Sequence, residues 1–155
     1  MIVRLARQED LPGFITLAGQ VEHWFGPMVD DPGFRFAVSR HIDRATAVVA
    51  AEPSGSELLG GLLFGAQASS YHIRWLVVSE STRGRGVGRA LVDDAVRRFV
   101  HDAGTLEVET FGADHPGAVT SGARVFYERL GFSQAEPAPA GPEGGSRQIY
   151  RRTVT

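Results

Sequence analysis

Hydrophobic side chains recur along the chain with two different periods, every second residue as in a strand and every three to four residues as in a helix, and both periods occur in the first half. Residues 2–6 alternate singly, which predicts a strand with one buried face. After Pro12 the apolar side chains recur at helical spacing, and a second helix is predicted over about residues 34–42. The first of these two helices would bury Phe14, Leu17 and Ala18.

Two β-prone runs, residues 46–51 and 58–64, are separated by a polar stretch that contains proline and glycine. They predict an antiparallel hairpin. Gly60 and Gly61, inside the second run, indicate a bulge or the close approach of another segment. A third strand is predicted over residues 71–78, which completes a meander.

The second half alternates helices with strands. The first helix there has one apolar stripe, which consists of Val87, Leu91, Ala95 and Phe99. Residues 105–110 predict a strand, residues 119–130 a helix that ends at Gly131, and residues 148–154 a last strand. This order is typical of an α/β fold with a right-handed crossover. Residues 133–147, rich in proline and glycine, are predicted to be a long loop, either a lid or a tolerated insertion.

Composition narrows the class of protein. The chain has 155 residues, 43% apolar and 22% charged, which suits one domain over residues 1–155. Its net charge of −2 is spread along the chain, so neither nucleic acid nor a membrane is an expected partner. No stretch approaches the ~20 apolar residues of a membrane span, and the N-terminus lacks the apolar core of a signal peptide. We therefore expect a cytoplasmic protein.

The chain contains neither cysteine nor lysine. The lack of cysteine excludes disulfides, thiolate zinc sites and a cysteine nucleophile, and we expect no metal. The lack of lysine excludes a Schiff base, and it also excludes the Gly-Lys-Ser/Thr loop that binds ATP or GTP.

Glycines alternate with larger side chains directly before the first helix of the second half, in the run Arg83-Gly84-Arg85-Gly86-Val87-Gly88-Arg89. The first N–H groups of a helix lack carbonyl partners, and glycine lets an anion approach them. A dinucleotide fingerprint does not fit, because its third glycine position is Arg89. The run predicts either a pyrophosphate site or a flexible connection between strand and helix.

The pattern Arg-x-x-Gly-x-Gly, met by Arg83, Gly86 and Gly88, resembles the acyl-CoA-binding motif of the GNAT superfamily of N-acetyltransferases. The resemblance implies an α/β fold with a mixed, mostly antiparallel sheet of six to seven strands and about four flanking helices, splayed at the acyl-CoA site. Acetyl-CoA would be the cosubstrate, with its pyrophosphate on the amides of this turn and its pantetheine arm on the preceding strand.

A second match lies about forty residues further on, where Ala123, Tyr127 and the pair Gly131-Phe132 are similar to the family's A-x-x-x-Tyr-x-x-x-Gly-Phe. The family commonly has an asparagine seven residues before this tyrosine, and Thr120 stands there instead. The resemblance implies that the residues that bind acetyl-CoA are Leu76, Val77, Val78, Arg83, Gly84, Arg85, Gly86, Val87, Gly88, Arg89, Thr120, Ala123 and Phe126.

By the same resemblance Tyr127 lies near the thioester sulfur, where a phenol that is protonated at neutral pH can protonate the departing thiolate. Otherwise it is an ordinary core residue. A base must take a proton from the substrate ammonium, and the candidates are His72, Glu109 or a chain of waters. His72 lies six residues before Val78, so strand alternation predicts that both point to the same face. Serotonin N-acetyltransferases resemble this arrangement in having a histidine on that strand.

The aromatic segment around Trp24 and Phe25 is broken by glycine and proline, so it cannot be a long helix. Its side chains would either close the core or form a substrate pocket in which nearby acids attract a cation. The predicted function is transfer of an acetyl group from acetyl-CoA to a primary amine of a small molecule or peptide, by direct attack in a ternary complex. The alternative is a non-catalytic acyl-CoA sensor. Exposed strand edges and this aromatic segment would allow a homodimer.

Overall fold

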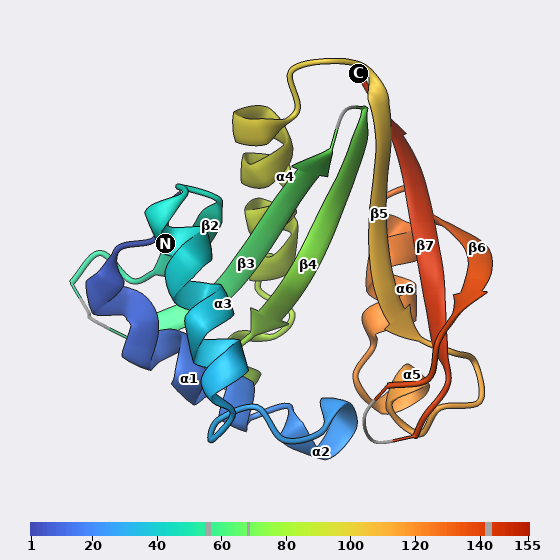
Figure 1. Ribbon diagram of the computed structural model, residues 1–155, viewed down its shortest axis with the longest axis horizontal. Helices are drawn as coiled ribbons and strands as arrows, with labels where there is room; N and C mark the ends of the chain where they lie inside the picture. The colour runs from blue at the N-terminus through green and yellow to red at the C-terminus, as the bar shows by residue number, and fades with distance from the viewer. Residues whose placement is uncertain (55–56, 68, 142–143) are drawn as a thin grey trace.

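A seven-stranded sheet forms the centre of the computed structural model, which describes residues 1–54, 57–67, 69–141 and 144–155. The strands lie in the order β1-β2-β3-β4-β5-β7-β6, and only the β4–β5 pair is parallel (Figure 1). The predicted α/β fold with a mostly antiparallel sheet is confirmed. The strands are β1 (Ile2–Leu5), β2 (Ala47–Ala51), β3 (Leu58–Gln67), β4 (Ser70–Val78), β5 (Gly104–Phe111), β6 (Ser133–Ala138) and β7 (Arg147–Val154).

Helices cover both faces of the sheet. In Figure 1, α1 (Leu11–Gly19) and α3 (Pro32–Asp43) lie in front of it, and α4 (Val87–Phe99) and α6 (Ala123–Arg129) lie behind it. The remaining helical segments are single turns: η1 (Gln8–Asp10), α2 (Glu22–Phe25), η2 (Glu80–Thr82) and α5 (Gly117–Thr120). Within the described residues no helix is long and apolar enough to cross a bilayer.

Each face of the sheet buries its own apolar cluster. We call them the α4/α6 cluster and the α1/α3 cluster, after the helices that cover each face. Alternation along β3 shows the division, because Leu62 packs in the α4/α6 cluster and Leu63 packs in the α1/α3 cluster. Gly60 and Gly61 permit this two-sided packing: a Cβ on Gly60 would come within 2.9 Å of Leu91, and one on Gly61 within 2.7 Å of Phe14. The predicted close approach at these two glycines is confirmed.

Strands β4 and β5 separate along their length, which Figure 1 shows as a wedge between them. Their pairing joins Ser70–Ile73 to Thr105–Val108 and then stops, although β4 continues to Val78. A bulge coincides with the end of the pairing, because Trp75 lies opposite Leu63 and Ile73 opposite Phe64, which leaves Arg74 as the extra residue. The predicted splay is present.

The bulge reverses the side-chain order of β4. Leu76 and Val78 pack with the α4/α6 cluster, as Tyr71 and Ile73 do before the bulge, whereas Trp75 and Val77 pack with the α1/α3 cluster. His72 lies between Tyr71 and Ile73 in the chain and therefore points to the α1/α3 face. The prediction that His72 and Val78 share a face is wrong, because it counted an uninterrupted period of two.

Two further predictions need correction. The helix expected over residues 119–130 is split into α5 and α6, because Gly122 adopts a left-handed φ of 69° between them. The loop expected over residues 133–147 contains β6, which pairs with β7. Pro137 is tolerated there because β6 is an edge strand whose register shifts between Gln134 and Pro137. Residues 142–143 of this stretch, and residues 55–56 of the hairpin connection, lie outside the described part.

Candidate active site

A cleft of about 1380 Å³ occupies the wedge between β4 and β5. Because the two strands part there, the cleft has walls from both faces of the sheet. One wall consists of the glycine-rich turn and α6, and the other of α2, the start of α3 and the α1/α3 face of β5 and β7. A ligand that enters from one face can therefore meet a ligand that enters from the other.

The glycine-rich turn has the backbone that an anion site requires. Gly84 and Gly86 have left-handed φ angles of 82° and 80°, with open space where a Cβ would be. Gly86 is the N-cap of the 13-residue helix α4, so the N–H groups of its first turn have no intrahelical acceptor. Gly88 lets α4 approach α6, because a Cβ there would lie 2.8 Å from the Phe126 ring.

The three arginines of the turn have different surroundings. Arg83 and Arg89 line the cleft. The Arg83 guanidinium lies 5.1 Å from the centre of the Trp24 ring, on the opposite wall. Arg85 is directed away from the cleft, toward Glu52 at 3.5 Å, and its N–H donates to the Thr82 carbonyl. Two of the three cations are thus available to a ligand in the cleft.

The second half of β4 exposes backbone groups to the wedge. The Ser79 N–H donates to the Leu59 carbonyl at 2.8 Å, in the same antiparallel register that joins Gly61 to Val77. Since the direction of backbone groups alternates along a strand, Val77 points its N–H and C=O at β3, and Leu76 and Val78 point theirs into the wedge. Of the three residues predicted to contact the pantetheine arm, Leu76 and Val78 therefore offer backbone groups to the wedge and Val77 does not.

Tyr127 lies on α6 and lines the cleft, although its side chain is buried. Its ring makes edge contacts with Phe126 and Phe132, with centroids 5.0 and 5.5 Å away. Burial raises the pKa of the Tyr127 phenol, so the hydroxyl stays protonated at physiological pH. No hydrogen bond to the hydroxyl occurs among the described residues, so its proton is free for a ligand.

The segment before Tyr127 places two of three predicted residues at the cleft. Ala123 and Phe126 line it. Thr120 does not, because its hydroxyl donates to the Pro116 carbonyl at 2.6 Å, within α5 and the turn before it. A threonine can satisfy its own backbone in this way, whereas the longer asparagine side chain of the family pattern could not do so as readily.

The aromatic segment lies between the core and the cleft. Trp24 and Phe25 are partly buried against the α1/α3 cluster and also line the cleft. Their role as a substrate pocket stays a prediction. Glu22 is not free to attract a cation, because it accepts hydrogen bonds from the N–H groups of Met28 and Val29 at 2.5 and 3.0 Å. These bonds hold the pKa of the Glu22 carboxyl below its ordinary value and hold the segment in a closed turn.

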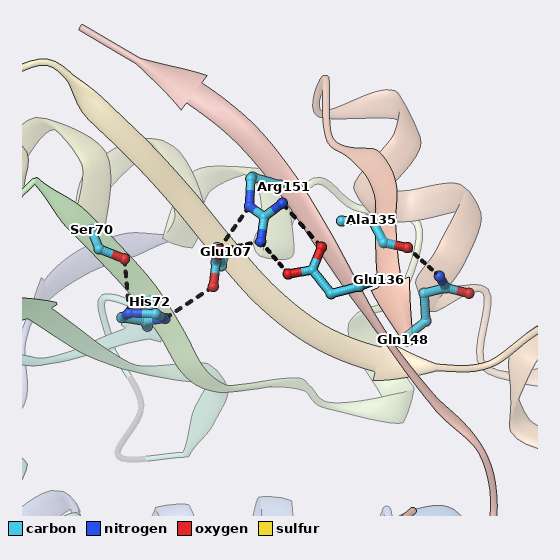
Figure 2. Close-up of polar contacts among 7 residues, drawn as sticks. All are labelled: Ser70, His72, Glu107, Ala135, Glu136, Gln148 and Arg151. Atoms are coloured by element: carbon cyan, nitrogen blue, oxygen red, sulfur yellow. Dashed lines mark hydrogen bonds and ion pairs between the residues drawn. The ribbon is translucent and has the colours of Figure 1, made fainter. Parts of the chain in front are cut away.

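Both predicted base candidates line the cleft from its α1/α3 side. Figure 2 shows His72 on β4 beside Glu107 on β5, with the His72 Nδ1 atom 3.7 Å from the Glu107 carboxylate and Nε2 3.1 Å from the Ser70 hydroxyl. Glu109 lies just past Val108, the last residue of β5 that pairs with β4, and is exposed. Among the described residues no three His, Asp or Glu side chains gather as a metal site.

Several residues of the cleft were not identified from the sequence. Phe111 stacks on Phe25 with ring centroids 4.7 Å apart, and the Arg147 guanidinium lies 4.9 Å from the Phe25 ring centre. Glu107 lies two residues before Glu109 on β5 and also lines the cleft. The alternation of acids on β5 was a signal for Glu107, but Arg147 lay inside a stretch that was predicted to be a loop.

A sheet that opens beside its parallel pair of strands, with a glycine-rich turn and the buried Tyr127 on one wall of the gap, is the arrangement that the resemblance to acyl-CoA-dependent transferases implies. The family model for the acetyltransferase (GNAT) domain matches residues 43–134. The chain belongs to the GNAT acetyltransferase family. It is therefore an acyltransferase, of a family that uses acetyl-CoA.

Solved structures share the fold across the whole chain. A protein assigned to the GNAT family from Desulfovibrio desulfuricans is 23% identical, with a TM-score of 0.76 over 99% of each chain. The ribosomal-protein-alanine N-acetyltransferase of Brucella melitensis is 18% identical, with a TM-score of 0.73 over 99% of this chain and 100% of that one. A chain of the NatC complex bound to Gag peptide and CoA is 15% identical, with a TM-score of 0.75 over 99% and 98%. No curated protein sequence matches the chain.

Proposed function

We propose that this chain, as one domain over residues 1–155, transfers an acetyl group from acetyl-CoA to a primary amine by direct attack. The observation that carries the proposal is the wedge between β4 and β5, because it brings a backbone-lined channel and two candidate bases into one cleft. A thiol ester held along the open edge of β4 would meet an amine held on the α1/α3 face. Proximity of this kind replaces a covalent acyl-enzyme, for which the chain has no cysteine.

The acetyl-CoA site uses backbone more than side chains. The turn from Arg83 to Arg89 offers the unpaired N–H groups at the start of α4, and the Arg83 and Arg89 side chains add positive charge. Leu76 and Val78 offer backbone groups along the wedge, where they can pair with the amides of a pantetheine arm as a neighbouring strand would. Arg85 and Thr120 have other partners, so we assign them no direct contact.

The chemistry requires three proton transfers. His72 takes a proton from the substrate ammonium, with Glu109 or a water as the alternative, so that the neutral nitrogen can attack the thioester carbonyl. As the carbon–nitrogen bond forms and the carbon–sulfur bond breaks, Tyr127 donates its proton to the departing thiolate. The phenolate then recovers a proton from the nitrogen of the new amide. The backbone N–H groups of Leu76 and Val78 are placed to stabilise the carbonyl oxygen.

The acceptor amine enters on the aromatic wall. Trp24 and Phe25 offer apolar faces there, and Glu109 offers a negative charge for an ammonium. A small amine and the N-terminus of a peptide both fit this description. Two structural neighbours, whose names mention a ribosomal protein and a peptide, support the inclusion of peptides in any screen.

The test is a panel of primary amines and peptides with free N-termini, assayed for release of CoA thiol from acetyl-CoA. The protein has no cysteine, so it contributes no background in a thiol assay. Turnover with at least one acceptor is expected, together with an acetylated product seen by mass spectrometry. A protein that binds acetyl-CoA tightly and acetylates nothing on the panel would instead be the non-catalytic sensor.

A further inference from the structure

A row of polar side chains crosses four neighbouring strands on the α1/α3 face, beside the wedge. Figure 2 shows it: Ser70 and His72 on β4, Glu107 on β5, Arg151 on β7 and Glu136 on β6. His72 and Glu107 line the cleft, and Glu136, the last member, is more than half exposed. The row therefore connects the candidate base to the solvent-exposed edge of the sheet.

Backbone pairing fixes the order of the row. The parallel register puts His72 beside Glu107, and the antiparallel register of the next pair puts Glu107 opposite Arg151. The backbone register itself brings the side chains of direct cross-strand partners close together, whichever rotamers they adopt. Glu136 is placed by the irregular stretch of β6, where the register shifts between Gln134 and Pro137.

The contacts within the row are unequal. Glu107 Oε1 accepts a hydrogen bond from Arg151 Nε at 2.7 Å, whereas Glu107 Oε2 lies 3.7 Å from His72 Nδ1. Arg151 in turn donates two hydrogen bonds to the Glu136 carboxylate, at 3.1 and 2.6 Å. Glu107 is thus held by Arg151 and presents its second oxygen to the imidazole.

The charges of the row nearly cancel. Glu107, Arg151 and Glu136 sum to −1 when all are ionised, so a proton on His72 makes the row neutral. The other charged side chains that line the α1/α3 side of the cleft are Arg74 on β4, Glu109 on β5, Arg147 on β7 and Asp31, the N-cap of α3, and β3 places the uncharged Gly65 opposite His72. These four residues contribute two charges of each sign. The row therefore carries the excess of negative charge on this side of the cleft.

We propose that Glu107 is a positioning residue for His72, and that Arg151, held by Glu136, limits how strongly Glu107 acts. The inference rests on the proposed function with His72 as the base. The Glu107 carboxylate orients the ring and stabilises the imidazolium that forms when His72 takes the ammonium proton, as a carboxylate does for a histidine base in general. Arg151 works against that stabilisation, because it neutralises the same carboxylate.

The two partners should consequently move His72 in opposite directions. Without the carboxylate, in Glu107→Gln, the imidazolium loses its counter-charge, so His72 titrates at lower pH. In Arg151→Met the guanidinium no longer offsets the negative charge of Glu107, so His72 is expected to titrate at higher pH. Both displacements should be small, since the side chains are partly exposed and solvent screens their charges. Glu136→Gln should act in the same direction as Glu107→Gln but less, because it frees Arg151 for Glu107.

The experiment has two readouts on the full chain. Nuclear magnetic resonance of histidine-labelled protein gives the titration midpoint of His72 directly, with His72→Asn to identify its signal among the five histidines. The acid side of the pH profile of kcat/KM gives the midpoint that matters for activity. Glu9→Gln, on the exposed η1 turn, removes an equal charge far from the row and should leave both midpoints unchanged.

Opposite displacements in Glu107→Gln and Arg151→Met, seen by both readouts, would support the proposal. Equal midpoints in wild type and Glu107→Gln, or displacements of the same sign, overturn it. If Arg151→Met does not fold, Arg151→Lys is the substitute. It keeps the positive charge but cannot donate to Glu107 and Glu136 at once, so the titration midpoint of His72 should rise by a smaller amount. A protein that acetylates no amine refutes the proposed function, while the resonance titration still tests the row itself.

Discussion

The two walls of the cleft differ in the chemical groups that they present. On the α4/α6 side the ligand-facing groups are mostly main chain: the amides at the start of α4 and the backbone of Leu76 and Val78. On the α1/α3 side they are side chains from several separate elements, such as Trp24, His72 and Arg147. A backbone site needs little besides glycine at the right spacing, so one short stretch of sequence specifies it. A site made of side chains is assembled by the fold and leaves no compact signature.

Tyr127 lies on α6, in the α4/α6 wall, and its substitution should show the largest effect. Tyr127→Phe removes the only proton that the proposed mechanism gives to the thiolate, so kcat should fall about 100-fold or more. The KM values for both substrates should stay within about twofold, because the buried ring is kept. Steady-state kinetics measure this. Tyr150→Phe, which alters another buried tyrosine with a hydrogen bond to Glu128, is the matched control and should retain kcat. Equal loss in both variants would assign Tyr127 a structural role.

The main-chain wall should be vulnerable to a change that adds only a methyl group. Gly86→Ala puts a Cβ on a residue with a φ of 80°, which costs about 1–2 kcal/mol, and the turn can relieve that strain by leaving its anion-binding shape. The KM for acetyl-CoA should rise about tenfold while the KM for the amine changes little. Gly144→Ala is the control, because Gly144 has a φ of 83° but lies outside the cleft. If both variants leave the KM for acetyl-CoA unchanged, the turn does not bind the cosubstrate.

The side-chain wall should respond in the opposite way. Trp24→Leu shortens an aromatic side chain of the proposed acceptor pocket, so the KM for an amine should rise about five- to tenfold as apolar contact is lost. The KM for acetyl-CoA should rise less than threefold, since the substitution removes only the ring on which Arg83 rests. Phe36→Leu, an exposed aromatic on α3 away from the cleft, serves as the control. A larger change for acetyl-CoA than for the amine would place Trp24 on the cosubstrate side.

The smallest expected effect concerns the turn that holds the aromatic wall. Glu22 has a pKa below its ordinary value of 4.5, so its contribution to the turn is complete above that pH and is lost as the pH falls through the lower value in the folded protein. Glu22→Gln should therefore raise the KM for the amine about two- to threefold at pH 7, and the difference from the wild type should disappear only as the pH falls well below 4.5. Glu57→Gln, an exposed acid, is the control. A pH-independent difference would assign the effect to packing instead of charge.

The same contrast decides how much was predictable from the sequence. The glycine turn and the Tyr127 segment could be found because their spacing along the chain is the spacing that the ligand requires. The bulge at Arg74 could not be found, since one extra residue in a strand of nine leaves the hydrophobic pattern plausible in either register. It reversed the expected relation of His72 to Val78.

Long-range partners were the other limit. Glu107 was visible as an acid on an alternating strand, but its contact with Arg151 depends on which strand lies beside β5. The chain neighbour in sequence is β6, yet the sheet places β7 there. Glu136 was hidden further, because proline at position 137 indicated a loop, whereas an edge strand tolerates it.

The parting of β4 from β5 also has a consequence for the folded state itself. The main-chain donors and acceptors of Leu76 and Val78 that face the wedge have no partner on β5, so hydrogen bonding across the sheet is incomplete there. A pantetheine arm that pairs with them would serve as a missing strand, and acetyl-CoA would then be a folding ligand as well as a reagent. Its binding should raise the melting temperature and slow amide exchange selectively along β4, so the supply of cosubstrate would govern how long the protein survives as well as how fast it works.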